Sequence, residues 1–292
     1  MSFITYLING ISLGSVYAII ALGYTMDYGI AKMLNFAHGD VIMIGSYTVF
    51  MTVSTMGLPT PVGMIISIIL CTLLGVVIEK IAYKPLRGAT SSLAVLITAI
   101  GVSYFLQNVA LLAFGANTKA FSSVVNIDPI IIGGITITGE TLVTIITCII
   151  IMVVLTLFVN KTKAGQAMLA VSQDKGAAQL MGINVNGTIS LTFAIGSGLA
   201  AIAGMLLCSS YPALTPYTGS MPGIKAFVAA VFGGIGSIPG AFIGGLILGV
   251  IEILAKAYIS SQLSDAIVFL VLILVLLIKP TGLLGKKISE KV

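Results

Sequence analysis

The chain has 292 residues, of which 58% are hydrophobic and only 8% are charged, and its formal net charge at pH 7 is +5. Together with a mean hydropathy of +1.16, this composition excludes a water-soluble domain, because such domains carry roughly 25% charged residues. One histidine, and three cysteines that each lie alone in an apolar segment, predict neither a metal site nor a disulfide framework.

Long apolar segments dominate the chain, and each approaches or reaches the roughly 20 residues that a helix needs to cross a membrane. They are continuous rather than alternating, which favours helices over a β-barrel. In chain order they are Phe3–Met26, Val41–Gly57, Val62–Tyr83, Ser91–Phe114, Thr141–Val159, Thr188–Cys208, Pro239–Ile259 and Ser264–Lys279, with a shorter, glycine-interrupted segment at Gly223–Gly236. We predict an all-α polytopic membrane protein of about eight full transmembrane helices plus this short segment, forming one membrane domain over residues 1–292.

A polar interruption after the first predicted span contains Asp27, Lys32, His38 and Asp40. Ionisable groups close to membrane depth are candidates for a functional site. The alternative is an inner loop in water, in which His38 is a cap or a hydrogen-bonded core residue. For His38 we favour this alternative.

The loop at residues 115–140 contains Ile127-Asp-Pro-Ile-Ile-Ile-Gly-Gly-Ile-Thr-Ile-Thr-Gly139. Asp-Pro and Gly-Gly separate short β-branched runs, which is typical of a small hairpin. We predict a hairpin on the outer surface of the membrane. A plain connector and a docking element remain equally open as its role.

The segment Lys161–Gly187, called the polar insert below, is the one long polar stretch of the chain. Small and apolar residues recur in it at helical spacing. Asp174 is placed to cap a second short helix that ends at Gly182. The insert therefore predicts two short helices at the inner membrane face, and its lack of aromatic anchors favours a protein partner over lipid.

Two interruptions of apolar sequence occupy similar positions in the two halves of the chain. Paired interruptions of this kind indicate inverted repeats around a central pathway, because irregular backbone at membrane depth must face protein or water. The candidate pathway residues are Asn35, His38, Gly39, Gly233, Gly234, Gly236, Pro239 and Gly240. The second interruption lacks the Lys-Ser/Thr ending of a phosphate-binding loop, so we predict no nucleotide site in it.

Further along, Glu252 and Lys256 are spaced to pair on one helix face, and we favour a structural pair over a transport site. No set of residues for nucleophilic, aspartyl or zinc-dependent catalysis is present in the sequence. We expect no catalytic residue, no cofactor and no nucleic-acid partner for this chain.

The basic residues predict the orientation in the membrane. With the N-terminus outside and Gly223–Gly236 counted as a crossing, 11 of the 14 Lys and Arg residues fall inside, and Lys119, Lys225 and Lys256 fall outside. Positive charge is enriched in cytoplasmic loops. We therefore predict an outside N-terminus and a cytoplasmic C-terminus.

Several motifs of this sequence resemble those of branched-chain amino-acid ABC transporter permeases, and the resemblance extends over nearly the whole chain. The motifs are Asn35-Phe-Ala-His-Gly39 with Met43, Gly45 and Tyr47; Leu86-Arg87-Gly88 with Ile97-Thr98, Gly101, Ser103 and Gln107-Asn108; Gln173-Asp174, Ala177-Ala178 and Gly182-Ile183-Asn184; and Phe232-Gly-Gly-Ile-Gly-Ser-Ile-Pro-Gly240 with Gly244-Gly245. The chain is most similar to the shorter, LivH-type subunit. One departure is Leu169, where the family often has arginine.

The resemblance implies one permease subunit of an ATP-driven importer for branched-chain, hydrophobic amino acids in a bacterial or archaeal cell membrane. It implies three kinds of partner: a second permease subunit in a hetero- or homodimer, two ATPase subunits that bind ATP, and an extracytoplasmic substrate-binding protein. The residues expected to couple to the ATPases are Gln173, Asp174, Ala177, Ala178 and Gly182.

Two other classes of protein stay open. A self-sufficient secondary transporter or a channel for a small neutral solute would need intramembrane carboxylates if proton or sodium gradients drive it, and the spans offer mainly Glu252. An intramembrane enzyme would need a nucleophile with a base, and the sequence lacks this combination.

Overall fold

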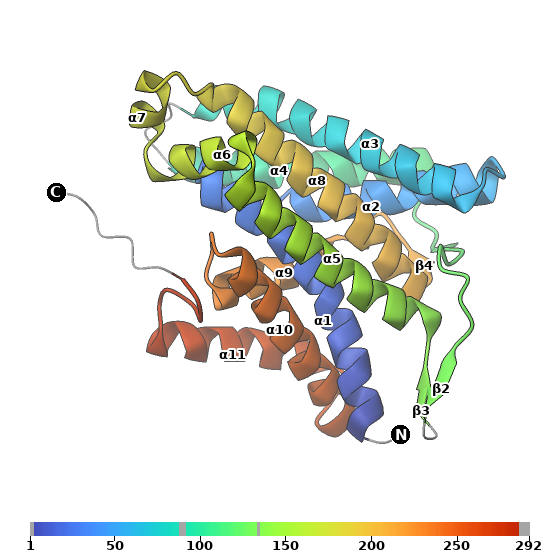
Figure 1. The fold of residues 1–292 in the computed structure, drawn as a ribbon. Coiled ribbons are helices and arrows are strands. Elements are labelled where there is room, and N and C mark those ends of the chain that lie inside the picture. Colours follow the sequence, from blue (N-terminus) through green and yellow to red (C-terminus); the bar gives the residue numbers. More distant parts are fainter. Residues whose placement is uncertain (1–2, 88–91, 133–134, 286–292) are drawn as a thin grey trace.

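The computed structural model describes residues 3–87, 92–132 and 135–285, and most of them are helical (Figure 1). The helices are α1 (Phe3–Met26), α2 (His38–Val49), α3 (Thr60–Ile78), α4 (Ser92–Phe114), α5 (Gly139–Lys161), α6 (Lys163–Gln173), α7 (Lys175–Leu180), α8 (Val185–Ser210), α9 (Ser220–Gly233), α10 (Ile238–Tyr258) and α11 (Ser264–Ile278). Three of them continue into π-helical turns: η1 (Asp27–Ala31) after α1, η2 (Phe50–Thr55) after α2 and η3 (Glu79–Tyr83) after α3. A short 3₁₀ turn, η4 (Lys84–Leu86), follows η3.

The lengths of these helices confirm the predicted class, an all-α polytopic membrane protein. Within the described ranges, 6 helices are long and apolar enough to cross a membrane. The predicted span Val41–Gly57 is divided between α2 and η2. The segment predicted as Ser264–Lys279 forms the 15-residue α11, and Gly223–Gly236 corresponds to the 14-residue α9.

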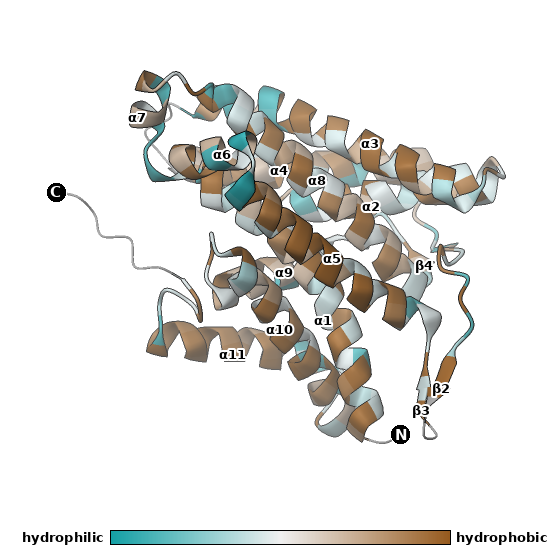
Figure 2. Ribbon diagram, viewed as in Figure 1, coloured by the Kyte–Doolittle hydropathy of each residue, from teal (hydrophilic) through white to brown (hydrophobic). Residues whose placement is uncertain are grey.

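The core lies around α1 and α8, whose side chains are largely buried. Helices α3 and α5 pack on this pair and α4 packs on α2, and all three turn much of their apolar surface outward. Figure 2 shows hydrophobic residues along the outer faces of α3, α5 and α11, whereas hydrophilic residues gather near α6 and α7. Apolar side chains that face outward over whole helices suit contact with lipid.

Small residues bring α1 and α10 together as antiparallel neighbours. Gly10, Gly14 and Ala18 of α1 lie against Val250, Leu246 and Gly245 of α10, respectively. A Cβ atom added to Gly249 of α10 would lie 2.1 Å from the backbone nitrogen of Gly14. In lipid, the hydrophobic effect does not drive helices together. Close approach stabilises the pair instead, because the backbone atoms of the two helices then pack directly against each other. The backbones of α1 and α10 have no room for a larger side chain here.

The two ends of the bundle can be told apart by their contacts. The start of α1 lies beside the end of α10, where the rings of Tyr6 and Tyr258 are 5.7 Å apart. At the other end, Gly29 of η1 approaches Gly236, and Leu283 donates a backbone hydrogen bond to Phe232. The chain after α11 therefore lies at the end of the bundle that carries η1 and α7, opposite the start of α1 (Figure 1).

The predicted hairpin is confirmed. Strands β2 (Ile130–Ile132) and β3 (Ile135–Ile137) pair antiparallel, with Ile130 opposite Ile137. The Gly-Gly pair that was expected to turn the chain, residues 133–134, lies outside the described residues. A second pairing was not predicted: β1 (Lys119–Ala120) pairs with β4 (Ala213–Leu214) and joins this loop to the connection between α8 and α9.

Candidate functional site

The polar insert forms the two short helices that the sequence predicts. The Thr162 hydroxyl caps α6 by accepting a hydrogen bond from the Gly165 amide at 3.0 Å. The Asp174 carboxylate caps α7 by accepting from the Ala177 amide at 3.0 Å. After α7 the chain turns at Gly182, where φ is +83°, a conformation that favours glycine. The predicted cap at Asp174 and the turn at Gly182 are both confirmed.

The outward surface of the insert differs from the expected one. Leu180 and Met181, at the tip of α7, are 90% and 83% exposed. Ala178 points into the chain instead and is only 4% exposed, so its methyl group is not part of the outward surface. From the family resemblance, Ala178 was expected to be one of the residues that contact the ATPase. The helical period of α7, however, turns Ala178 inward. Gln173, Asp174, Ala177 and Gly182 are exposed.

A lysine connects the insert to the membrane helices. Lys175, the first residue of α7, donates a hydrogen bond from Nζ to the carbonyl oxygen of Ala31 at 2.9 Å. Ala31 is the last residue of η1. Burial lowers the pKa of Lys175, and the nearby charges of Arg87 and Lys32 lower it further. The insert is thus held against η1, at the end of α1, by a specific polar contact.

The polar segment after α1 is buried or half-buried except for Lys32, so the alternative of an inner loop in water is wrong. Asp27, His38 and Asp40 are all fully or almost fully buried. Asn35 donates to the Asp27 carboxylate at 2.9 Å, and the Tyr83 hydroxyl donates to the Asn35 side-chain oxygen at 3.1 Å. These bonds replace water as hydrogen-bond partners and join η1 to η3.

His38 is a core residue, as favoured from the sequence, but it does not cap α2, and among the described residues neither of its ring nitrogens has a hydrogen-bond partner. It is the first residue of α2, and its ring packs on Tyr24 with a centroid distance of 4.7 Å. A Cβ atom added to Gly23 would lie 2.5 Å from its ring, so α1 needs a glycine opposite the imidazole. Its Nδ1 lies 3.9 Å from the Asp27 carboxylate. His38 therefore fixes the start of α2 against α1.

The candidate pathway residues fall into two groups with different neighbours. Asn35, His38 and Gly39 surround the start of α2, and Gly39 lies against Gly219 and Gly223 at the start of α9. The other group lies at the opposite end of α9. It consists of Gly233, Gly234, Gly236, Pro239 and Gly240, and it forms the turn from α9 into α10. A pathway role for either group stays a prediction.

A cleft of about 380 Å³ opens beside the first group. It is lined by Gly39 and Asp40 of α2, by residues of α4 and α9, and by Tyr24 and Phe36. The lining residues are Tyr24, Phe36, Gly39, Asp40, Ile100, Ser103, Tyr104, Gln107, Ser220, Gly223 and Ile224. We call this the α2/α4/α9 cleft. Its size falls in the range of small-molecule sites.

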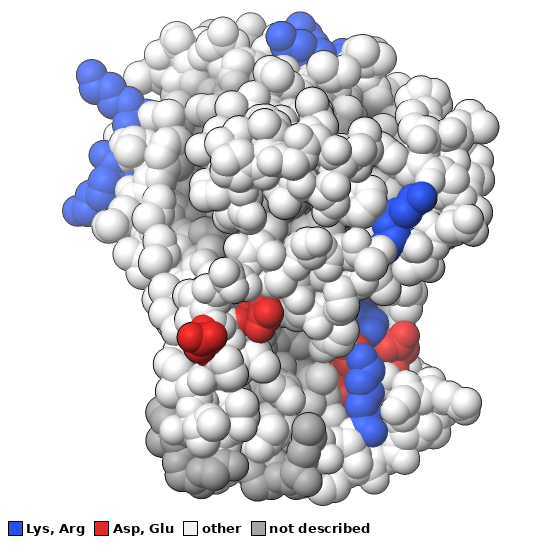
Figure 3. Space-filling view, turned by 90° about the vertical axis from the view of Figure 1, so that its right-hand side faces the viewer, with Lys and Arg blue, Asp and Glu red and all other residues white. Residues whose placement is uncertain are grey.

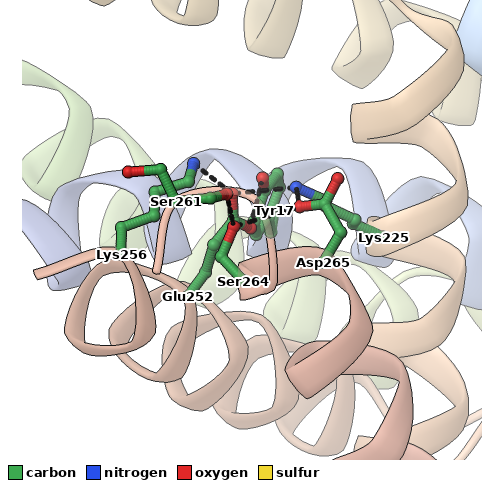
Figure 4. A network of polar contacts seen from close by, with 7 residues as sticks. All are labelled: Tyr17, Lys225, Glu252, Lys256, Ser261, Ser264 and Asp265. Carbon is green, nitrogen blue, oxygen red and sulfur yellow. Dashed lines mark hydrogen bonds and ion pairs between the residues drawn. The ribbon is translucent and has the colours of Figure 1, made fainter. Parts of the chain in front are cut away.

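Toward the start of α1, Glu252 is the centre of a charged network (Figure 4). The predicted pair is confirmed, since Lys256 lies 2.6 Å from the Glu252 carboxylate. Lys225 of α9 contacts the same carboxylate at 2.8 Å and Asp265 of α11 at 2.7 Å, and the Tyr17 hydroxyl donates to Glu252 at 2.8 Å. We call this the Glu252 network. It ties α1, α9, α10 and α11 together.

Charged side chains are sparse on the face of the molecule that Figure 3 shows. Figure 3 shows a mostly uncharged surface on which basic and acidic side chains meet closely in one area. Lys225 and Asp265 were not found by sequence reasoning, because they lie on helices other than that of Glu252 and meet only through the packing of α9, α10 and α11. The sequence did contain one indication, because Lys225 lies within an apolar segment, and burying a lysine without a partner costs free energy.

Truncation of Glu252 is expected to destabilise the protein strongly. Glu252→Ala removes one of the two carboxylates of the buried Lys225 and the acceptor of the Tyr17 hydroxyl. Breaking a buried ion pair costs about 3–5 kcal/mol, and we expect the lower end because Asp265 still pairs with Lys225. Thermal unfolding in detergent should show a clear loss for Glu252→Ala. Lys256→Ala, at a 38% exposed side chain, is the control and should change little. Equal unfolding of the two variants would contradict this role for Glu252.

The helical bundle and its outward apolar faces define a multi-pass membrane protein. The family model described as branched-chain amino acid transport system / permease component matches residues 6–276. The chain belongs to this family.

Relatives support the same family over nearly the full chain. The chain is 47% identical over 303 residues to the high-affinity branched-chain amino acid transport system permease protein LivH of Salmonella typhimurium, covering 99% of this chain and 98% of the relative. It is 44% identical to the corresponding permease protein BraD of Pseudomonas aeruginosa, with the same coverage. A solved structure, PsaBC from Streptococcus pneumoniae in complex with Fab, is similar with a TM-score of 0.49 and 14% identity, covering 97% of this chain and 91% of that one.

Proposed function

We propose that this chain is the membrane-spanning permease subunit of an ATP-driven importer of branched-chain amino acids. The observation that carries the proposal is the 44–47% identity, over 99% of this chain, to permease proteins of high-affinity branched-chain amino acid transport systems. The fold is compatible with this role because the bundle combines lipid-facing apolar helices with polar groups in its interior.

The proposed assembly contains a second permease subunit, two ATPase subunits and an extracytoplasmic substrate-binding protein. ATP is bound and hydrolysed by the ATPase subunits, and this chain carries no cofactor. The polar insert is the proposed ATPase contact, with Leu180 and Met181 as its apolar tip and Gln173, Asp174, Ala177 and Gly182 around them. The exposure of two large apolar side chains on an otherwise polar segment supports this contact.

The proposed location is the inner or plasma membrane of a bacterium or archaeon. The N-terminus lies outside, and the polar insert and the C-terminus lie in the cytoplasm. Two observations support this orientation. The uneven distribution of Lys and Arg favours it, and the start of α1 lies at the opposite end of the bundle from the insert (Figure 1).

A second candidate is a self-sufficient secondary transporter. It is favoured by the carboxylates that the fold buries, since Asp27, Asp40 and Glu79 join Glu252 in the interior. Carboxylates inside a membrane protein are the groups that gradient-driven carriers use for proton or sodium coupling.

Uptake of labelled leucine into proteoliposomes separates the two candidates. For the importer we expect uptake only when both permease subunits, the ATPase subunits, the binding protein and ATP are all present. Hydrolysis-deficient ATPase subunits serve as the control and should abolish uptake. Uptake by this chain alone, driven by a proton or sodium gradient, would refute the importer and support the secondary transporter.

A further inference from the structure

We propose that the α2/α4/α9 cleft is a binding site for the transported amino acid, in which Asp40 binds the ammonium group and the apolar lining holds the side chain. The proposal rests on the proposed import of branched-chain amino acids and names the site at which this chain contacts them.

The charge of Asp40 is the first argument. Asp40 is only 2% exposed, and its carboxylate accepts hydrogen bonds from two neutral side chains, Nε2 of Gln107 at 2.9 Å and the hydroxyl of Ser103. Glu79 and Glu252, which are also buried, each form an ion pair with a basic side chain. Within the described part of the chain, Asp40 forms none. A buried carboxylate without a cation is costly, so a positively charged ligand would be bound favourably here.

The fixed geometry around Asp40 is the second argument. The Gln107 amide nitrogen also lies 3.2 Å from Ser103 Oγ and 3.2 Å from Ser220 Oγ. These contacts link α4 to α9 and aim the amide donor at Asp40. A carboxylate has about four acceptor positions, so Asp40 keeps capacity for an ammonium group after it has bonded Gln107 and Ser103.

The remaining lining of the cleft is the third argument. Tyr24, Phe36, Ile100, Tyr104 and Ile224 contribute aromatic and aliphatic surface. The lining residues include no Lys or Arg among the described positions. The cleft therefore fits a solute with an ammonium group beside an apolar side chain. It does not supply a cation for the solute's carboxylate.

The close approach of α9 to α2 brings the lining residues of these two helices together. A Cβ atom added to Gly223 would lie 2.8 Å from the Cα of Gly39, and one added to Gly39 would lie 2.7 Å from the carbonyl oxygen of Gly219. The glycines let the two helices touch by their backbones. Asp40 and Ser220, which are far apart in the sequence, are thereby brought to the same cleft.

The variant Asp40→Asn tests the proposal in the complete transporter. The asparagine oxygen can still accept from Gln107, so the fold is retained while the charge is lost. An ionic hydrogen bond contributes about 10- to 100-fold in affinity. We expect the KM for leucine uptake to rise by about that factor, with unchanged membrane accumulation and subunit co-purification. Asp128→Asn, in the exposed loop before β2, is the matched control and should transport normally.

A thiol-protection assay adds a direct readout of binding. Ile224→Cys is introduced into a chain in which Cys71, Cys148 and Cys208 are replaced, after leucine uptake by this background has been verified. Excess leucine should slow modification of Cys at position 224 by a small water-soluble thiol reagent. The analogue 4-methylpentanoate, which lacks the ammonium group, should not slow it, and Asp40→Asn should remove the protection by leucine.

Several outcomes would overturn the site. They are a normal KM for Asp40→Asn, equal protection by leucine and 4-methylpentanoate, or loss of the second permease subunit from purified Asp40→Asn, which would assign Asp40 to the subunit interface. If the wild-type complex does not import leucine at all, the proposed function fails instead. The wild-type assay thus separates the two failures.

Discussion

Replacing Leu180 and Met181 together with aspartate is expected to abolish both co-purification of the ATPase subunits and transport. These two side chains are 90% and 83% exposed at the tip of α7. If they are covered by the ATPase, each aspartate brings an unpaired charge into that interface, at a cost of several kcal/mol. The affinity should then fall by at least about 100-fold. The chain itself should still fold, because neither side chain packs within it.

Affinity purification of the tagged chain from membranes measures this effect, with the amount of co-purified ATPase as the readout. Gln166→Asp, on the exposed surface of α6, is the control for an added negative charge on the insert and should retain the ATPase. Retention of the ATPase and normal transport by the double variant would show that the tip of α7 is not the contact. Ala178→Trp does not discriminate, because Ala178 is buried and tryptophan there would disturb the chain's own packing.

Gly249→Leu is expected to prevent stable accumulation of the protein. The first atom of any side chain at position 249 meets the backbone of Gly14, so α10 must move away from α1 along their whole contact. Overpacking costs typically about 1–3 kcal/mol, and a clash with backbone should reach or exceed the upper value because no side chain can move aside.

The control for this substitution lies on α4. A Cβ atom added to Gly101 meets no atom within 4 Å, so Gly101→Leu adds the same side chain to another apolar helix without a clash. Immunoblots of membranes and thermal unfolding in detergent compare the two variants. Similar amounts and similar unfolding temperatures would contradict the close packing of α1 on α10.

Local features of this fold could be predicted from the sequence alone. The bounds of α1, α4 and α10 differ from the predicted spans by only one residue at the ends, since apolar runs and their polar borders decide where a helix lies in a membrane. The cap at Asp174 and the β2–β3 hairpin depend on a few neighbouring residues and were also predicted.

Features that depend on contacts between distant segments were not predictable. Asp27 and Asp40 look like residues of a solvated loop until the packing of α8 and α9 around them is known. Lys225, the partner of Glu252 on α9, lies 27 positions away in the sequence, and Gln107, the partner of Asp40 on α4, lies 67 positions away. The exposure of Leu180 could not be predicted, because α7 is too short for the spacing of its apolar residues to show which of its faces is buried.

The π-helical turn at the end of α1 has a mechanical consequence. In such a turn the hydrogen bonds span five residues rather than four. A shift of one residue between these two bonding registers moves the following chain by about 1.5 Å along the helix axis and by about 100° around it. Lys175 holds the last carbonyl of this turn, and Asp27 in its first position holds Asn35. A displacement of α7 would therefore be transmitted through Lys175 to η1, a turn that can change between π-helical and α-helical hydrogen bonding. Through Asp27 and Asn35, the same turn is also bonded to the segment that leads into α2.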